Sequence, residues 1–165
     1  MQKYSNEELQ VLVSQWGLDR KITINGKIST QTIKFGEEFG ELFEADTFPK
    51  VKDAIGDMIV VLSMIADLNK TSIMACKELH PRSTILNNIK YSSTDALSIV
   101  YGRLCSAVVR EKYDDLNVII QDFVEVLTKI AYTQGTSFNE CWNLAYNEIK
   151  DRTGTLLENG NFVKD

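Results

Sequence analysis

The sequence predicts an all-α fold, a helical bundle built from two tandem repeats and closed by a short C-terminal β-hairpin. Apolar residues recur at helical spacing through most of the chain, and no alternating strand pattern occurs before the tail. A twenty-residue segment also recurs 65 residues downstream. The 165 residues suffice for one domain with a substantial core. We therefore expect a single domain over 1–165, with repeat 1 at about 29–79, repeat 2 at about 94–151 and the hairpin at about 153–165.

The helices are expected between breakers and caps. Pro49, like the only other proline, falls between periodic segments, where helices commonly end. Ser5 and Ser137 are candidate N-caps, because a glutamate follows each of them three residues later in capping-box spacing. The tail LLENGNFVKD places Asn159-Gly160 between short apolar pairs, the pattern of a two-residue hairpin turn. The expected helices lie at about 6–17, 29–46, 50–69, 72–79, 94–111, 114–134 and 137–151.

An internal repeat organises the chain. DMIVVLSMIADLNKTSIMAC (57–76) matches DFVEVLTKIAYTQGTSFNEC (122–141) without a gap, with eight identities in twenty positions. Upstream, after a one-residue shift, KFGEEFGELFEA (34–45) falls on VYGRLCSAVVRE (100–111). This alignment replaces three glutamates of the first copy, Glu37, Glu38 and Glu41, by Arg103, Leu104 and Ala107. We therefore expect a duplicated helical unit, an intrachain pseudo-dimer with one acidic site, and leave further homo-oligomerisation open.

Composition excludes several classes of function. A net charge of −5 argues against binding to nucleic-acid backbones. No stretch approaches the roughly 18 uncharged apolar residues of a membrane span, and MQKYSNEELQ lacks an export signal. Cys76, Cys105 and Cys141 are widely spaced and read as reduced residues of a cytoplasmic protein. His80, the only histidine, stands before Pro81, so we expect a helix-end residue and no histidine-based zinc site.

Acidic side chains gather on the expected helix 29–46. Phe35, Phe39, Leu42 and Phe43 form its apolar stripe; Glu38 lies at the edge of the stripe, and Glu41 and Glu37 lie further round. Like charges three or four residues apart on a helix repel by roughly 0.2–0.5 kcal/mol per pair. Glu44 points away from the stripe and is expected to be solvated. The other glutamates therefore lie at the border between core and solvent, where their repulsion requires an explanation.

Two aspartates follow on the next expected helix. Asp53 and Asp57 are four residues apart and share a face, and Asp57 precedes the apolar run MIVVL. A carboxylate in such surroundings is costly unless it is protonated, paired or bound to a metal. One hypothesis is an oxygen-only cluster that holds Mg²⁺ or Mn²⁺ against substrate phosphates. The alternative, a solvated acidic face with Asp57 paired to a lysine, stays open on spacing alone.

A family resemblance bears on this choice. Five segments carry it: WGLDRKI (16–22), QTIKFGEEFGELFEA (31–45), KDAIGDMIVVL (52–62), AYNEIKDRTG (145–154) and the closing ENGNFVKD. Together they resemble phage-type members of the MazG-like all-α nucleoside triphosphate pyrophosphatases. The resemblance covers the first 70 and the last 25 residues. The middle, about 80–135, looks like a fused second copy, as in the related dimeric dUTPases.

The resemblance implies Mg²⁺-dependent hydrolysis of a (deoxy)nucleoside triphosphate to a monophosphate and pyrophosphate, in the host cytoplasm if the chain is phage-encoded. The family signature is ExxE followed by ExxD. Glu38 and Glu41 match its first part, Asp57 ends its second, and Ala54 replaces the second glutamate, so that Asp53 is the expected substitute. The implied metal ligands are Glu38, Glu41, Asp53 and Asp57, with Mn²⁺ as an alternative metal. Glu37 or Glu38 is the implied general base, and the implied substrate-binding residues are Lys34, Asn147, Lys150 and Arg152.

Other interpretations remain. Lys150 and Arg152 are also the charges that complement a helix C-terminus, and Trp16 and Arg20 are also typical of core packing and surface charge. A phosphoribosyl-ATP pyrophosphatase or a dUTPase-like hydrolase of the same superfamily would differ in substrate. A non-catalytic acidic helical adaptor would bind a basic partner and require no metal. The sequence does not distinguish the preferred base or the number of metal ions.

Overall fold

The computed structural model describes residues 2–79 and 92–165. The helices are α1 (Asn6–Asp19), α2 (Ile22–Asn25), α3 (Ile28–Glu44), α4 (Phe48–Leu68), α5 (Ile73–Leu79), α6 (Ser93–Val109), α7 (Leu116–Thr133) and α8 (Phe138–Ile149), with a 3-10 turn, η1 (Tyr113–Asp115), before α7. The strands β1 (Gly154–Leu156) and β2 (Phe162–Lys164) form an antiparallel hairpin. The mostly helical fold with a C-terminal hairpin is therefore confirmed. The expected positions of His80 and Pro81 lie outside the described residues.

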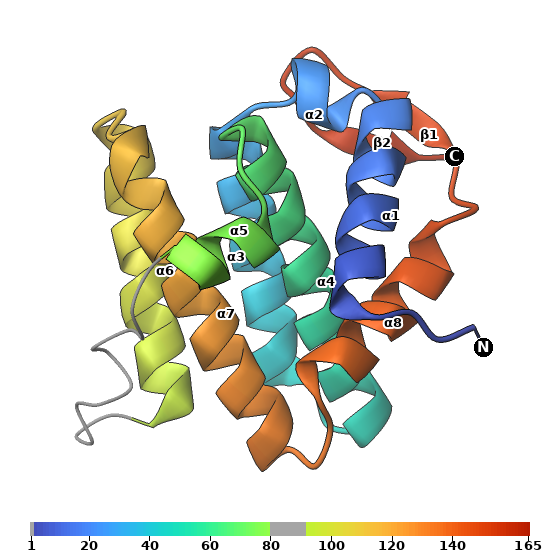
Figure 1. Ribbon diagram of the computed structural model, residues 1–165, viewed down its shortest axis with the longest axis vertical. Helices are drawn as coiled ribbons and strands as arrows, with labels where there is room; N and C mark the ends of the chain where they lie inside the picture. The colour runs from blue at the N-terminus through green and yellow to red at the C-terminus, as the bar shows by residue number, and fades with distance from the viewer. Residues whose placement is uncertain (1, 80–91) are drawn as a thin grey trace.

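Helix α4 is the centre of the molecule. It packs against α3, α8, α7 and α1, and its residues from Ala54 to Ala66 are buried on nearly all sides, with Asp57 an exception. In Figure 1, α6 and α7 lie on one side of α3 and α4, and α1, α8 and the hairpin lie on the other. A helix that is apolar all round is stable only in such a position. Any carboxylate on α4 therefore faces the core or one of its packing partners.

Local signals explain several helix starts. Ser5 forms the expected capping box with Glu8, and Ser137 accepts a hydrogen bond from the backbone of Glu140. The sequence predicted that Pro49 lies between two helices. It lies instead in the first turn of α4, where its missing N–H costs nothing. The one-turn helix α2 was not predicted. Within the described residues, no helix is long and apolar enough to cross a membrane.

The C-terminal hairpin has a longer loop than predicted. Strand pairing joins Gly154 to Lys164 and Leu156 to Phe162, which leaves residues 157–161 as the connection. Gly160 takes a positive φ of 86°, as a glycine in this turn allows. Thr30 Oγ1 donates a 2.6 Å hydrogen bond to the carbonyl oxygen of Asn159. The two-residue turn was therefore wrong, and the loop instead docks on the first turns of α3.

The two halves of the chain have matching element boundaries. Helices α3 and α6 each span 17 residues and begin 65 residues apart, as do α5 and α8, and the ends of α4 and α7 show the same spacing. The turns also match: the Thr71 amide donates to the Ala66 carbonyl at 3.0 Å, and the Thr136 amide donates to the Ala131 carbonyl at 3.0 Å. These starts, ends and turns share the offset of 65, whereas α4 and α7 begin 68 residues apart.

For α3 and α6, this offset differs by one residue from the shifted alignment that the sequence suggested. With it, three of the four buried residues of α3, Gln31, Thr32 and Phe35, fall on the buried Ala96, Leu97 and Val100, whereas the fourth, Glu38, falls on the exposed Arg103. The three glutamates then correspond to other residues than predicted: Glu37, Glu38 and Glu41 to Gly102, Arg103 and Ser106. Leu104 and Ala107 are buried and face the core. At this offset Arg103 corresponds in sequence to Glu38.

Candidate functional site

A pocket of about 430 Å³ lies between α3, α4, the end of α8 and the hairpin. One part of its wall is charged and the other is apolar. The charged residues are Lys34, Glu37, Glu38, Glu41, Asp57, Glu148, Arg152 and Lys164. The rest of the wall is formed by Trp16, Ile22, Gln31, Val60, Val61, Met64, Ile149, Asn161 and Phe162. We refer to this hollow as the acidic pocket, because five carboxylates face three cations in it.

Glu38 is the buried carboxylate of α3. It is 4% exposed, and Lys34, one turn earlier, places its Nζ 2.7 Å from Glu38 Oε1 and 2.9 Å from Glu37 Oε2. Burial raises the pKa of Glu38; Lys34 opposes this rise, and the neighbouring charges of Glu41 and Glu37 add to it. Glu37 itself is mostly exposed. The acidic face of α3 is therefore not uniformly solvated: one of its glutamates is held inside the protein, against the pocket.

Asp57 is the matching carboxylate of α4. Its burial raises its pKa to about 7, and the negative charges of Glu38, Asp53 and Glu148 raise it as well, against the lowering effect of Arg152. Within the described chain, no lysine lies within ion-pair distance of Asp57. The alternative in which a lysine neutralises Asp57 is therefore not what the structure contains. Asp57 is a half-buried acid with too little positive charge around it.

The end of α8 supplies two further charges. Glu148 and Arg152 form a 2.8 Å ion pair one turn apart, and both line the pocket. Desolvation raises the pKa of Asp53, and Glu148 raises it further by its charge and by a hydrogen bond. These groups meet because α4 and α8 cross closely at Gly56, where a Cβ would contact the Cys141 carbonyl oxygen and lie 2.9 Å from Ala145 Cβ. The glycine thus sets the distance between Asp57 and the end of α8.

Helix α1 and the hairpin contribute the aromatic residues of the pocket, Trp16 and Phe162. The Trp16 ring is 8% exposed; its Nε1 donates to the Ile149 carbonyl at 2.8 Å, and it meets Phe162 edge to face at 5.9 Å. Arg20 stacks on the Trp16 ring at 4.7 Å and donates hydrogen bonds to the backbone oxygen of Arg152. Trp16 and Arg20 therefore tie α1 to the end of α8. Gln31 is buried in the same wall and provides an amide among apolar neighbours.

The structure brings together most of the residues that the sequence selected. Lys34, Glu37, Glu38, Glu41, Asp57 and Arg152 line the pocket, and Asp53 is close enough for its charge to act on Asp57. Ala54 is 3% exposed and faces the core, so Asp53 is the α4 residue of that turn near the other carboxylates.

Asn147 and Lys150 are not brought to this pocket. Asn147 donates to the backbone oxygens of Gln2 and Asn143, and Lys150 Nζ lies 3.3 Å from Asn147 Oδ1 on an exposed face. Sequence reasoning missed Glu148. The available signal was helical spacing, because residues 148 and 152 are four apart, the spacing of side chains that meet along a helix, whereas 150 lies about 200° from 148.

A metal ion in the acidic pocket would need several carboxylate oxygens close together. Among the described residues, no group of three or more carboxylate, thiol or imidazole side chains is arranged closely enough to hold one. The chemistry of the donors nevertheless fits a hard divalent cation, since every acidic group here is a carboxylate. The raised pKa of Asp57 points the same way, because the pocket lacks the positive charge that an ionised Asp57 requires.

No family model, curated protein or solved structure matches the chain.

Proposed function

We propose that the protein is a Mg²⁺-dependent nucleoside triphosphate pyrophosphohydrolase that releases pyrophosphate and a nucleoside monophosphate. The observation that carries the proposal is the convergence of Glu38 from α3 and Asp57 from α4 in one pocket, whose wall also contains cations and apolar side chains. A nucleotide needs both kinds of surface, because its phosphates are charged and its base is flat and largely apolar. The resemblance to the MazG-like pyrophosphatases supports this reaction independently of the geometry.

Four carboxylates would hold the metal: Glu38, Glu41, Asp53 and Asp57. Glu148, which the sequence analysis did not select, is an additional candidate ligand, because its charge raises the pKa of both Asp53 and Asp57. Bound Mg²⁺ or Mn²⁺ would neutralise phosphate charge and lower the pKa of a coordinated water. Without it, the carboxylates repel one another and also repel a triphosphate. On this proposal, the cost of gathering them is offset when the metal binds.

The remaining steps belong to side chains of the chain. Glu38 is better placed than Glu37 to accept a proton from the attacking water at a carboxylate oxygen, because burial raises the pKa of Glu38 towards the working range of a base. Arg152 and Lys164 offer donors to the phosphates from the opposite wall, and Lys34 does so from α3. Trp16 and Phe162 provide the surface against which the base packs.

The proposal includes the architecture that the resemblance implied. The halves are copies of one helical unit, and they form an intrachain pseudo-dimer of the MazG-like type in which only the first half keeps the acidic site. The matching bounds and turns of the two halves support a duplication. The expected cytoplasmic location belongs to the same proposal.

Burial counts against the adaptor as the alternative. An acidic surface that docks a basic partner needs its charges accessible, yet Glu38 is 4% exposed and Asp57 is half-buried in a concave site. Burying carboxylates in that way costs stability without helping a surface contact. No described feature favours a second function over hydrolysis.

The test is a panel of ribo- and deoxyribonucleoside triphosphates with direct detection of pyrophosphate, in Mg²⁺, Mn²⁺ or EDTA. We expect release with at least one nucleotide and either metal, and none in EDTA. Glu38→Gln should abolish it, whereas the matched control Glu44→Gln, at an exposed position of the same helix, should retain it. Absence of pyrophosphate with every nucleotide and both metals would refute the proposal.

A further inference from the structure

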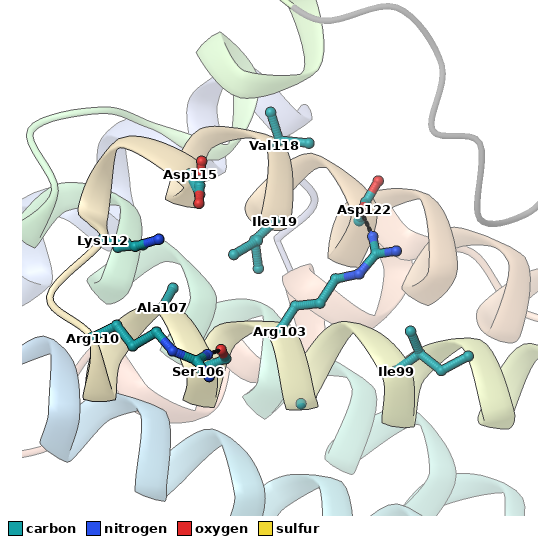
Figure 2. Close-up of a pocket in the computed structure, with 11 residues that line it drawn as sticks. Ile99, Arg103, Ser106, Ala107, Arg110, Lys112, Asp115, Val118, Ile119 and Asp122 are labelled. Carbon is teal, nitrogen blue, oxygen red and sulfur yellow. Dashed lines mark hydrogen bonds and ion pairs between the residues drawn. The ribbon is translucent and has the colours of Figure 1, made fainter.

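A second pocket, of about 600 Å³, lies in the other half of the protein. It opens between α6, the turn that follows α6, and the beginning of α7 (Figure 2). Its wall consists of Ile99, Gly102, Arg103, Ser106, Ala107, Arg110, Lys112, Asp115, Val118, Ile119 and Asp122. We call it the basic pocket, since three cations face two carboxylates in it, in a chain whose net charge is −5.

The basic pocket is the counterpart of the acidic pocket. Five residues of the acidic pocket's α3 and α4 walls fall, at the offset of 65, on residues that line the basic pocket. They are Lys34, Glu37, Glu38, Glu41 and Asp57, which fall on Ile99, Gly102, Arg103, Ser106 and Asp122. Because α6 and α7 repeat the packing of α3 and α4, the same part of the helix pair is hollow in both halves. The hollow is retained, although the residues around it have changed.

The change inverts the charge. Arg103 stands where Glu38 stands, and its Nη1 lies 3.1 Å from Asp122 Oδ2. Asp122 is almost fully buried, whereas the Arg103 side chain is 52% exposed. A guanidinium has five N–H donors, so the ion pair with Asp122 leaves others for a ligand. The positions of Glu37 and Glu41 hold a glycine and a serine, which removes the carboxylates that would repel an anion.

Two further cations extend the positive wall. Arg110 ends α6 and donates a hydrogen bond to Ser106 Oγ, which holds its guanidinium along the pocket side of the helix (Figure 2). Lys112 follows in the turn after α6 and lies on the same side of the pocket. Within the described residues neither of them makes an ion pair with a carboxylate. Their charges are therefore available to an anion.

The remaining wall suits a small organic molecule. Ile99, Val118 and Ile119 provide apolar surface next to the cations. A volume of about 600 Å³ falls in the range of small-molecule sites. Guanidinium and ammonium groups are the donors that bind phosphate oxygens most strongly. We propose that the basic pocket is a second ligand site, which binds a phosphate-bearing small molecule without a metal ion.

Independence from metal makes the proposal testable apart from any catalysis. In EDTA the five carboxylates of the acidic pocket oppose phosphate binding there, and the loss of binding in a variant of the basic pocket assigns the binding to that pocket. The experiment is calorimetric titration of the full chain in EDTA with tripolyphosphate and with ATP. The test variant is Arg110→Gln/Lys112→Gln; Arg103 is left in place because buried Asp122 requires its cation. The matched control, Lys3→Gln/Lys129→Gln, removes two exposed cations elsewhere.

We expect saturable binding to the parent and the control, weakened about tenfold or more in the test variant, since each charge-assisted hydrogen bond contributes substantially. Equal affinities for tripolyphosphate and ATP would show recognition of phosphates alone; tighter binding of ATP would show that the apolar wall accepts a nucleoside. Either result supports the proposal. It is overturned if the parent binds neither compound in EDTA, or if the test variant binds as tightly as the control.

Discussion

Replacing Asp57 by Asn tests whether the carboxylates were gathered for a ligand. Burial and neighbouring charges raise the pKa of Asp57 from 3.8 to about 7, so the folded protein holds a proton that the unfolded chain has released. Between pH 4 and 7 the folded state therefore binds more protons, and stability falls as pH rises; above about pH 7 the full cost remains. A pKa difference of this size corresponds to about 4 kcal/mol, which solvent around the half-buried side chain reduces to roughly 2–4 kcal/mol.

Asparagine carries no charge, so it removes this cost. In EDTA at pH 8 we expect Asp57→Asn to be more stable than the parent by roughly 2–4 kcal/mol, or about 4–15 °C in Tm. At pH 5 most of Asp57 is protonated in the parent, and the two proteins should melt within a few degrees of each other. Added Mg²⁺ should stabilise the parent, by about 2.7 kcal/mol at a hundred times Kd. It should stabilise the variant much less.

Asp67 offers a matched control on the same helix. Burial raises its pKa to about 6, Ser14 donates to its Oδ1 at 3.0 Å, and its Oδ2 has no hydrogen-bond partner among the described residues. Asp67→Asn should therefore show a gain of the same sign above pH 6 but an unchanged response to Mg²⁺. Thermal melts of the three proteins at pH 5 and pH 8, with EDTA or Mg²⁺, separate the cases. An Asp57→Asn protein that melts below the parent in EDTA at pH 8 would refute the reasoning.

Two further predictions concern the α8 side of the pocket. Gly56→Ala places a Cβ against the backbone of α8 and should cost about 1–3 kcal/mol in urea unfolding, whereas Gly40→Ala, with no atom within 4 Å of the added Cβ, should stabilise α3 by about 0.5–1 kcal/mol; equal effects would show that the crossing is not tight. Arg152→Gln should raise KM for a triphosphate about tenfold or more while Lys150→Gln changes it little; pyrophosphate-release kinetics decide this, and equal effects would contradict the placement of the two side chains.

The helices were predictable because their apolar periodicity and caps are local. Helix α2 was missed because a segment of four residues is too short to show a helical period. Its start also depends on Lys21, whose backbone is left-handed with a φ of 61°. The hairpin loop was predicted too short because Asn159-Gly160 specifies a turn but not the docking of Asn159 on Thr30. In both cases a contact outside the segment determined the result.

Part of the candidate site was predictable, because some of its residues stand out from their neighbours in the sequence. Glu38 and Asp57 stand out because a carboxylate beside apolar residues is visible in sequence. Glu148 is not, since its role depends on the crossing of α4 and α8 at Gly56. The correspondence of Glu38 with Arg103 did not follow from the sequence, because the one-residue shift aligned similar residue types, whereas α3 and α6 begin 65 residues apart.

Asp57 and Asp122 correspond at the offset of 65, and the charges around them are opposite in sign. Asp122 forms an ion pair with Arg103, whereas the charge of Glu38 next to Asp57 raises the pKa of Asp57. If stability alone had shaped both, the first half would have the same arrangement as the second. Keeping three repelling carboxylates, Glu38, Asp53 and Glu148, around Asp57 is instead what a site for a cation requires.

Transferring the second half's arrangement to the first gives the last prediction. In Glu38→Arg, a guanidinium replaces a carboxylate next to Asp57, so the pKa of Asp57 should fall and its ionisation should no longer oppose folding at pH 8. We expect a higher Tm than the parent in EDTA at pH 8, loss of stabilisation by Mg²⁺, and no pyrophosphate release. Glu38→Leu controls for the loss of the carboxylate alone and should give a smaller rise. A Glu38→Arg protein that melts below both the parent and Glu38→Leu would show that positions 38 and 103 are not equivalent, and the account of the two pockets as counterparts would fail with it.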